Sequence, residues 1–269
     1  MTTRINQPDW DRIAAKFDVL LPQLAPVGEE LLEALQVVPG DRVLDIASGT
    51  GEPALTLARR QPHARITGID AAEGMVRAAQ RKVVSGRLTN ISFQAMAAER
   101  MDFIDHSFDK ALCRFGVMLF EDPLAGCREI RRVLKPGGTF AFAVWSTAEM
   151  MTTLHWAVRA FRGRVPDDQL PPIEAATRLG RPGALDALLS AAGFSRFSIT
   201  PRRFDYHFES FDDYWNVMEA SEINRKQFDA LSAHERNSVR DEIASFTHDF
   251  QTDHGLVIPH EYLLATGEH

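Results

Sequence analysis

The stretch that decides the fold reads RVLDIASGTGEP at residues 42–53. Its first half is apolar and β-branched and predicts a buried strand. Gly49 and Gly51 then form a loop in which the backbone can approach a ligand closely, because glycine has no Cβ. A helix is expected from about Pro53, which is tolerated in a first helical turn. Open α/β sheets bind ligands at the carboxyl ends of their strands, so this loop predicts a cofactor site.

Two carboxylates flank the loop. Asp70 ends the second expected strand, 19 residues after Gly51, where an acid can accept hydrogen bonds from both ribose hydroxyls of an adenosine. Asp45 precedes the glycines, badly placed for a pyrophosphate but well placed for a cationic ammonium group. The pattern Gly49-x-Gly51-x-x-Ala54 also satisfies the dinucleotide fingerprint, so a nicotinamide cofactor stays open at this point. A turn that merely needs glycine is the third interpretation.

Strand-like and helix-like patterns alternate as far as Trp145, which is typical of a parallel sheet with crossover helices. The expected strands cover residues 42–47, 64–70, 91–96, 108–116 and 139–145, and the expected helices 53–60, 74–84 and 123–134. Beyond Trp145 we expect helices over about 149–192, a strand interrupted at Pro201, helices over about 211–250 and a last strand.

Composition restricts the partners. The 269 residues carry a net charge of −7, which argues against a nucleic-acid binder, because such a protein needs surplus Lys and Arg. Two cysteines, no signal-peptide pattern and no run of about 18 apolar residues favour a cytoplasmic protein without a membrane span. No metal site is expected, because His254 and His260 lack partners at ligand spacing. A homodimer is compatible with the sequence.

Four motifs in order carry a resemblance to a known family: VLDIASGTGEPAL, GIDAAEGMVRAA, SFDKALCRFGVMLFEDP and RRVLKPGGTFAFAVW. Over about Arg42 to Trp145 the chain resembles class I S-adenosylmethionine-dependent methyltransferases, in the branch of the ubiquinone/menaquinone C-methyltransferases. The resemblance implies an α/β, Rossmann-like, seven-stranded, mostly parallel sheet with helices on both faces. Its last strand should run antiparallel beside the fifth.

The expected organisation has four parts. They are an N-terminal helical lid (1–36), a cofactor-binding core (37–146), helical insertions that form an acceptor cap (147–193 and 209–252), and the terminal strands of the sheet (194–208 and 256–268).

The resemblance assigns the S-adenosylmethionine site by position. The methionine half falls to Asp45, Ala47, Gly49 and Gly51, with Arg114 and Phe115 beneath it. Asp70 takes the ribose, Ala71 and Met75 pack near the ribose and adenine, and Ala98 and Glu99 line the adenine end. Two positions depart from the family pattern. Ala47 replaces the first glycine of the usual loop, and Ala97 stands where the family often has an aspartate for the adenine amino group.

The function implied is methyl transfer to a small, partly apolar or aromatic metabolite, at carbon, oxygen or nitrogen. Aromatics in the lid and cap are the expected acceptor contacts: Phe17, Trp145, Trp156 and Trp215. The histidines His155, His207 and His260 are conceivable bases, but no catalytic residue is singled out. Two alternatives stay open. The chain could bind S-adenosylmethionine without methylating, as a pericyclase-like enzyme or a regulatory module, or it could be a nicotinamide-dependent reductase.

Overall fold

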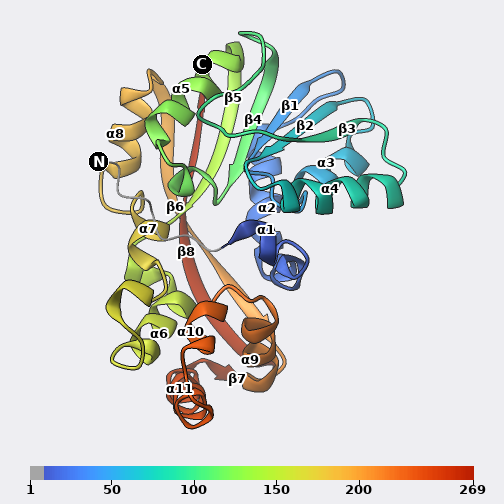
Figure 1. Cartoon of the computed structure of the whole chain (residues 1–269). Helices are drawn as coiled ribbons and strands as arrows, with labels where there is room; N and C mark the ends of the chain where they lie inside the picture. Colours follow the sequence, from blue (N-terminus) through green and yellow to red (C-terminus); the bar gives the residue numbers. More distant parts are fainter. Residues whose placement is uncertain (1–8) are drawn as a thin grey trace.

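The computed structural model describes residues 9–269. Its central sheet is built from strands that lie between residues 42 and 268 (Figure 1). Residues 1–8 of the expected lid lie outside the described residues. The strands are β1 (Arg42–Ile46), β2 (Arg65–Asp70), β3 (Ile91–Ala95), β4 (Phe108–Arg114), β5 (Leu134–Trp145), β6 (Arg196–Phe208), β7 (Gln251–Thr252) and β8 (Gly255–Glu268).

The sheet order confirms the expected topology, in which the last long strand inserts antiparallel beside the fifth. The order is β3-β2-β1-β4-β5-β8-β6. Strands β1 to β5 are parallel, and β8 pairs antiparallel with both β5 and β6. The sheet of the described chain has eight strands instead of the expected seven. The additional strand is β7, a two-residue segment that pairs only with β8.

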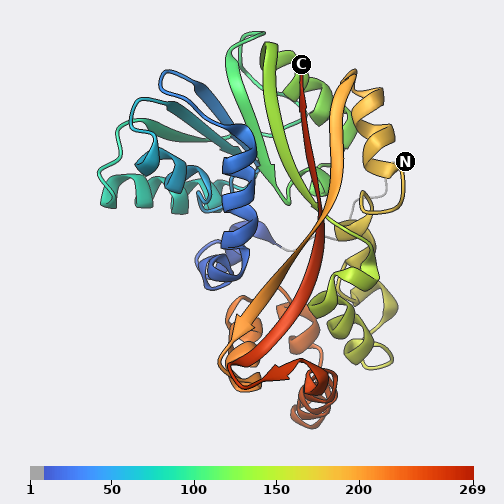
Figure 2. The ribbon, with the colours of Figure 1, turned by 180° about the vertical axis from the view of Figure 1, so that it is seen from behind.

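Helices cover both faces of the sheet (Figures 1 and 2). On one face lie α2 (Leu21–Leu35), α3 (Ala54–Arg60) and α4 (Glu73–Ser85), with Arg60 of α3 paired to Glu29 of α2. On the other face, α5 (Pro123–Val133) packs against α8 (Ala184–Ala191). The crossover helices α3, between β1 and β2, and α5, between β4 and β5, therefore lie on opposite faces of the sheet, as a doubly wound sheet requires.

Strand β6 runs without a break through Pro201, so the expected interruption there is wrong. Pro201 pairs with Leu263 of β8 within a continuous register from Arg196 to Phe208. The physical reason is the position of the strand. β6 is an edge strand with β8 as its neighbour, and proline is tolerated where its missing N–H would face away from the sheet.

The long strands β6 and β8 extend past the rest of the sheet and carry the helical insertions (Figure 2). These insertions hold η3 (Ala148–Met150), α6 (Thr152–Phe161), η4 (Asp167–Gln169), α7 (Ile173–Thr177), α9 (Phe211–Ala220), α10 (Arg225–Asp229), α11 (Ala233–Phe246) and η5 (His248–Phe250). The chain begins with α1 (Trp10–Ile13) and η1 (Phe17–Leu20), and η2 (Val117–Leu119) follows β4.

Two clusters of buried apolar residues hold the described chain together. The large one runs without interruption from the sheet, for example Leu44 and Phe142, into the insertions, for example Trp215 and Val239. The small one joins Ile13 and Ala14 of the N-terminal segment to Ala72 and Met75 at the start of α4. None of the helices in residues 9–269 is both long enough and apolar enough to cross a membrane.

Candidate cofactor and acceptor site

The glycine loop joins β1 to α3 at the carboxyl edge of the sheet. The Ser48 N–H donates to the Ile69 carbonyl at 2.9 Å and the Gly51 N–H to the Ser48 carbonyl at 2.9 Å. Gly49 and Gly51 have φ angles of 54° and 107°, which favour glycine. A Cβ built on Gly49 would meet no atom within 4 Å. The backbone at Gly49 therefore faces open space that a ligand can enter.

Asp70, at the end of β2, holds two neighbouring loops together. Its Oδ2 accepts a hydrogen bond from the Gly49 N–H at 2.9 Å, and its Oδ1 accepts one from the Ala72 N–H at 2.9 Å. Burial raises the pKa of this carboxyl, and the two N–H donors oppose that shift. Each carboxylate oxygen keeps a further lone pair, so Asp70 can still accept hydrogen bonds from a ligand.

Asp45 is buried with one of its oxygens unpaired. Only 1% of the residue is exposed, and within residues 9–269 its Oδ2 has no hydrogen-bond partner. Burial raises the pKa of this carboxyl well above its ordinary value, while the positive charge of Arg114 acts in the opposite direction. A buried oxygen without a donor is costly. This position therefore suits a ligand that brings a positively charged donor.

Arg114, the last residue of β4, is a cation held by backbone carbonyls. Its guanidinium donates to the Leu24 carbonyl at 3.2 Å and to the Glu52 carbonyl at 2.8 Å. Burial lowers its pKa, and the charges of Asp45 and Glu52 oppose that shift. No ion pair joins it to a carboxylate in the described chain, although a guanidinium has five N–H donors. Arg114 can therefore still receive an anionic group.

The N-terminal segment closes over the glycine loop and the start of α4. The Asp11 carboxylate accepts the Gly74 N–H. Asp18 accepts the Thr50 hydroxyl at 2.6 Å and forms an ion pair with Lys82 at 2.7 Å. This segment therefore covers the place where the adenosine of a nucleotide ligand would lie.

Apolar contacts complete this cover. Met75 is buried under Ile13 and Ala14, and Phe17 packs against the same cluster. The partly buried Ile223 from the insertion between β6 and β8 also joins it.

An ion-pair cluster at Glu222 connects the N-terminal segment to the cap. Lys16 lies 2.6 Å from the Glu222 carboxylate, and Arg12 lies 4.0 Å from it. Arg225, from the cap itself, lies 3.0 Å from the same carboxylate. The cover over the cofactor loop and the cap over the acceptor space are therefore in direct contact.

The expected acceptor aromatics fall into two groups. Trp145, at the end of β5, stacks face to face on Phe115 with ring centroids 3.9 Å apart, next to Arg114. Trp156 instead packs against Tyr214 and Phe250, and Trp215 against Phe211 and Phe228, inside the cap. The structure brings Trp145 to the loop edge and places the other two tryptophans in the core of the insertions.

The remaining assigned positions follow the ends of the first three strands. Ala71 is exposed, Ala98 is buried, and Ala97 is exposed. Glu99 accepts the Glu121 N–H at 2.8 Å, so one of its oxygens fixes the loop that follows β4. Ala47 has a φ of 54°, which explains why a glycine is usual at this position of the loop.

Tyr206 of β6 is a site residue that the sequence did not single out, and it contacts His260 of β8, one of the three histidines considered as a base. The His260 Nε2 accepts the Thr153 N–H at 3.2 Å, and its Nδ1 lies 3.1 Å from the Ile258 carbonyl. Burial lowers the pKa of His260 to about 4, so the ring is neutral with both nitrogens engaged. His260 is therefore a structural residue rather than a base. The alternation of Phe204, Tyr206 and Phe208 was the signal that this strand has an inward aromatic face.

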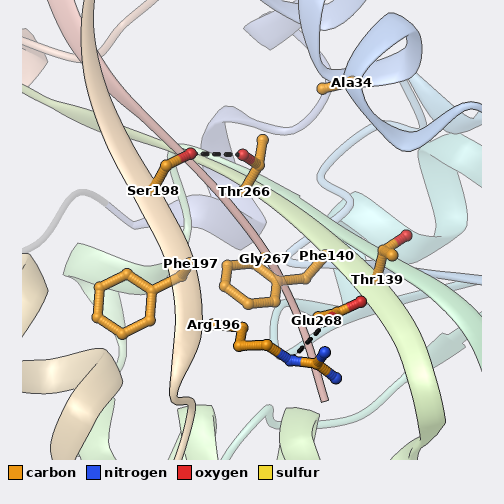
Figure 3. Close-up of a pocket in the computed structure, with 9 residues that line it drawn as sticks. All are labelled: Ala34, Thr139, Phe140, Arg196, Phe197, Ser198, Thr266, Gly267 and Glu268. Carbon is orange, nitrogen blue, oxygen red and sulfur yellow. Dashed lines mark hydrogen bonds and ion pairs between the residues drawn. The ribbon is translucent and has the colours of Figure 1, made fainter.

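Within residues 9–269, no group of three His, Cys, Asp or Glu side chains could hold a metal ion. A shallow depression of about 370 Å³ lies at the opposite edge of the sheet, between the starts of β5 and β6 and the end of β8 (Figure 3). Its polar groups pair with one another. Arg196 lies 2.6 Å from Glu268, and the Ser198 and Thr266 hydroxyls are 3.0 Å apart.

The part of the chain that contains the glycine loop matches a known protein family. Residues 43–138 match the family model described as a methyltransferase domain. This stretch is a methyltransferase domain. Its cofactor is S-adenosylmethionine. The domain includes the glycine loop, Asp70, Arg114 and Phe115 and ends within β5.

The methyltransferase domain has curated relatives among quinone-modifying enzymes. Over 157 residues the chain is 33% identical to the ubiquinone/menaquinone biosynthesis C-methyltransferase UbiE of Geotalea daltonii, covering 55% of this chain and 66% of that protein. It is 36% identical over 135 residues to the demethylmenaquinone methyltransferase of Thermotoga maritima, covering 48% of this chain and 56% of that protein. The chain thus matches between half and two thirds of the length of these relatives.

Structural comparison extends the likeness beyond the methyltransferase domain. The crystal structure of the YcgJ protein from Bacillus subtilis superposes with a TM-score of 0.64 at 20% identity. The match covers 91% of this chain and 98% of that one. At this level of identity the match shows the fold over most of the chain.

Proposed function

We propose that the chain is a methyltransferase that binds S-adenosylmethionine at the glycine loop and transfers its methyl group to a small, partly apolar or aromatic acceptor. One observation carries the proposal. Asp45 has a buried oxygen without a donor, and the nearby Arg114 has no carboxylate partner in the described chain. A buried carboxyl group and a partly buried guanidinium, each incompletely paired near the glycine loop, match the amino-acid zwitterion at the methionine end of this cofactor.

In this arrangement Asp45 Oδ2 would accept a hydrogen bond from the ammonium group of the cofactor, and Arg114 would donate to its carboxylate. Charge-assisted hydrogen bonds of this kind are about twice as strong as neutral ones. A dinucleotide would instead place a pyrophosphate near the Asp45 carboxylate and leave that acid without a cation. The charges at the loop therefore favour S-adenosylmethionine over a nicotinamide cofactor.

The other assigned residues take the rest of the cofactor in this proposal. Asp70 accepts the ribose hydroxyls with its free lone pairs, and Gly49, Gly51 and Ala47 let the backbone approach the methionine chain. Met75 packs against the adenine side under the N-terminal cover, together with Ala71, Ala98 and Glu99. The exposed Ala97 leaves the adenine amino group without a side-chain acceptor at that position.

The bound cofactor supplies a methyl group that its sulfonium already activates. The residues of the chain have to align the acceptor with that methyl group and exclude water, which is the main part of catalysis in such a reaction. The cover formed by α1 and η1 excludes water from the cofactor side of the site. His260 takes no part as a base, because its Nε2 lone pair already accepts the Thr153 N–H.

We place the acceptor between Phe115 and the cap. The Phe115–Trp145 stack presents an aromatic wall beside the methionine end of the site, whereas Phe17 lies with Met75 under the N-terminal cover. A net charge of −7 favours a small molecule over a nucleic acid. Cys113 and Cys127 are both free, which suits a cytoplasmic setting. Trp156 and Trp215 act in this proposal by shaping the cap.

Calorimetric titration of the protein with S-adenosylmethionine, S-adenosylhomocysteine and NAD tests the cofactor assignment. We expect saturable binding of the first two and none of NAD. Absence of binding to either sulfur compound would refute the proposal. A screen of small acceptors with labelled S-adenosylmethionine then tests transfer. A protein that binds the cofactor but labels no acceptor in the screen would be a non-methylating member of the fold.

A further inference from the structure

Tyr206 lies on the inward face of β6 and is held rigidly by its neighbours. Only 8% of the residue is exposed. Its ring stacks on His260 with centroids 4.1 Å apart, and the rings of Phe204 and Phe208 meet it edge to face. His260 is itself fixed through both ring nitrogens by Thr153 and Ile258. The phenol therefore has one well-defined orientation.

The hydroxyl of Tyr206 makes no hydrogen bond with another residue of the described chain, and it is not one of that chain's fully buried polar atoms without a partner. Buried tyrosine hydroxyls usually find a partner, and the nearby Tyr262 follows that rule by donating to Glu30. Burial raises the pKa of Tyr206. The hydroxyl is therefore protonated at neutral pH, so it can donate a hydrogen bond but cannot act as a base.

Two observations connect Tyr206 to the part of the site where we place the methionine end of the cofactor. A row of rings leads from Phe115 through Trp145 and His260 to Tyr206, with centroid separations of 3.9, 6.1 and 4.1 Å. The charge of Arg114 also acts directly on Tyr206, lowering its pKa against the effect of burial. Tyr206 thus lies within electrostatic reach of Arg114 and at the far end of a row of rings that begins at Phe115.

We propose that Tyr206 donates a hydrogen bond to a phenolic or enolic oxygen of the acceptor and thereby selects acceptors that carry such an oxygen. The proposal rests on the proposed function, because it places the acceptor between Phe115 and the cap. A hydrogen bond to an oxygen that carries negative charge is stronger than one to a neutral oxygen. Tyr206 therefore favours the acceptor after it has lost its proton, the form that attacks a methyl group.

The test uses two probes of similar shape, 4-nitrophenolate and 4-nitrotoluene, with the protein saturated with S-adenosylhomocysteine. Calorimetry at a pH above the nitrophenol pKa gives both affinities. We expect the wild-type protein to prefer the phenolate, and Tyr206→Phe to reduce that preference by about tenfold or more. Binding of 4-nitrotoluene and of S-adenosylhomocysteine should not change, because the ring and its stack on His260 remain.

Tyr262→Phe is the matched control, since it removes a hydroxyl whose partner is Glu30, and it should keep the phenolate preference. An unchanged preference in Tyr206→Phe, or no saturable binding of 4-nitrophenolate to the wild-type protein, would overturn the proposal. The titrations are repeated without S-adenosylhomocysteine. Failure of that compound to bind would count against the proposed function, and the phenolate comparison would still decide the role of Tyr206.

Discussion

Asp45 is a carboxyl group that the fold buries without a full set of donors. Because burial raises its pKa above the ordinary value of 3.8, the unfolded chain loses this proton at a lower pH than the folded chain does. The folded state therefore loses stability as pH rises above 3.8, until the pH passes the raised pKa. Asp45→Asn removes this loss, since an amide does not ionise.

We predict that Asp45→Asn, without cofactor, melts at the same temperature as the wild-type protein near pH 4. Toward pH 7 it should melt at a temperature higher by roughly a few degrees. Thermal unfolding followed by circular dichroism across this range is the measurement. If the variant is instead less stable than the wild-type protein at neutral pH, the attraction between Asp45 and Arg114 stabilises the fold by more than the burial of the Asp45 charge destabilises it.

The sequence identified the residues of the loop because their signal is local. Asp45, Gly49 and Gly51 lie in one segment, and Asp70 follows at a known spacing, so strand-loop-helix geometry predicts their neighbourhood. Tyr206 and His260 have no such local signal. They meet only because β6 and β8 pair in a register that places Phe204 opposite His260, and that register depends on the whole sheet.

The cover formed by α1 depends on a glycine in the first turn of α4. A Cβ on Gly74 would lie 2.6 Å from the Asp11 carbonyl oxygen and 3.0 Å from its Cα. These are backbone atoms, so the contact can be relieved only by moving α1 away. Alanine has the better helix propensity, so α4 itself should tolerate the change.

We therefore predict that Gly74→Ala leaves the fold intact but releases the N-terminal segment. Limited proteolysis should cut between residues 10 and 20 several times faster than in the wild-type protein, and cofactor affinity should fall. Arg77→Ala, on the exposed side of the same helix, is the control and should behave as the wild-type protein. Equal cleavage rates in all three proteins would mean that α1 does not depend on this contact.

At the level of elements, the parallel half of the sheet followed from patterning alone. Strands β1 to β4 were expected within two residues of their bounds, whereas β5 begins at Leu134, five residues before the expected start at residue 139. The errors in predicting the strands concern which strands pair with one another, and not the preference of single residues for strand structure. Pro201 indicated a break but lies in an edge strand, and β7 is a two-residue strand that pairs only with the first residues of β8, Gly255 and Leu256.

At the scale of the molecule, the sheet and the cap share one apolar core. The large cluster of buried residues runs from β1 through Trp145 into α9 and α11. The tryptophans lie in the N-terminal segment, at the end of β5 and in the cap, at positions 10, 145, 156 and 215. Their fluorescence therefore reports on the cap and its junction, whereas far-ultraviolet circular dichroism reports on all elements.

A shared core predicts that both signals change in a single transition with the same midpoint in urea. Separate midpoints would show that the cap unfolds independently of the sheet. In that case the acceptor space would belong to a semi-independent unit, and the contact at Glu222 would hold little of the structure together.

The central claim is that Asp45 and Arg114 bind the amino-acid end of the cofactor. Its most direct test compares calorimetric affinities for S-adenosylhomocysteine and 5′-methylthioadenosine, which lacks that end, in the wild-type protein and in Asp45→Asn. We predict a preference for S-adenosylhomocysteine of about 100-fold or more in the wild-type protein, and a preference at least about tenfold smaller in the variant. Equal affinities for the two compounds in the wild-type protein, or the same preference in both proteins, would contradict it.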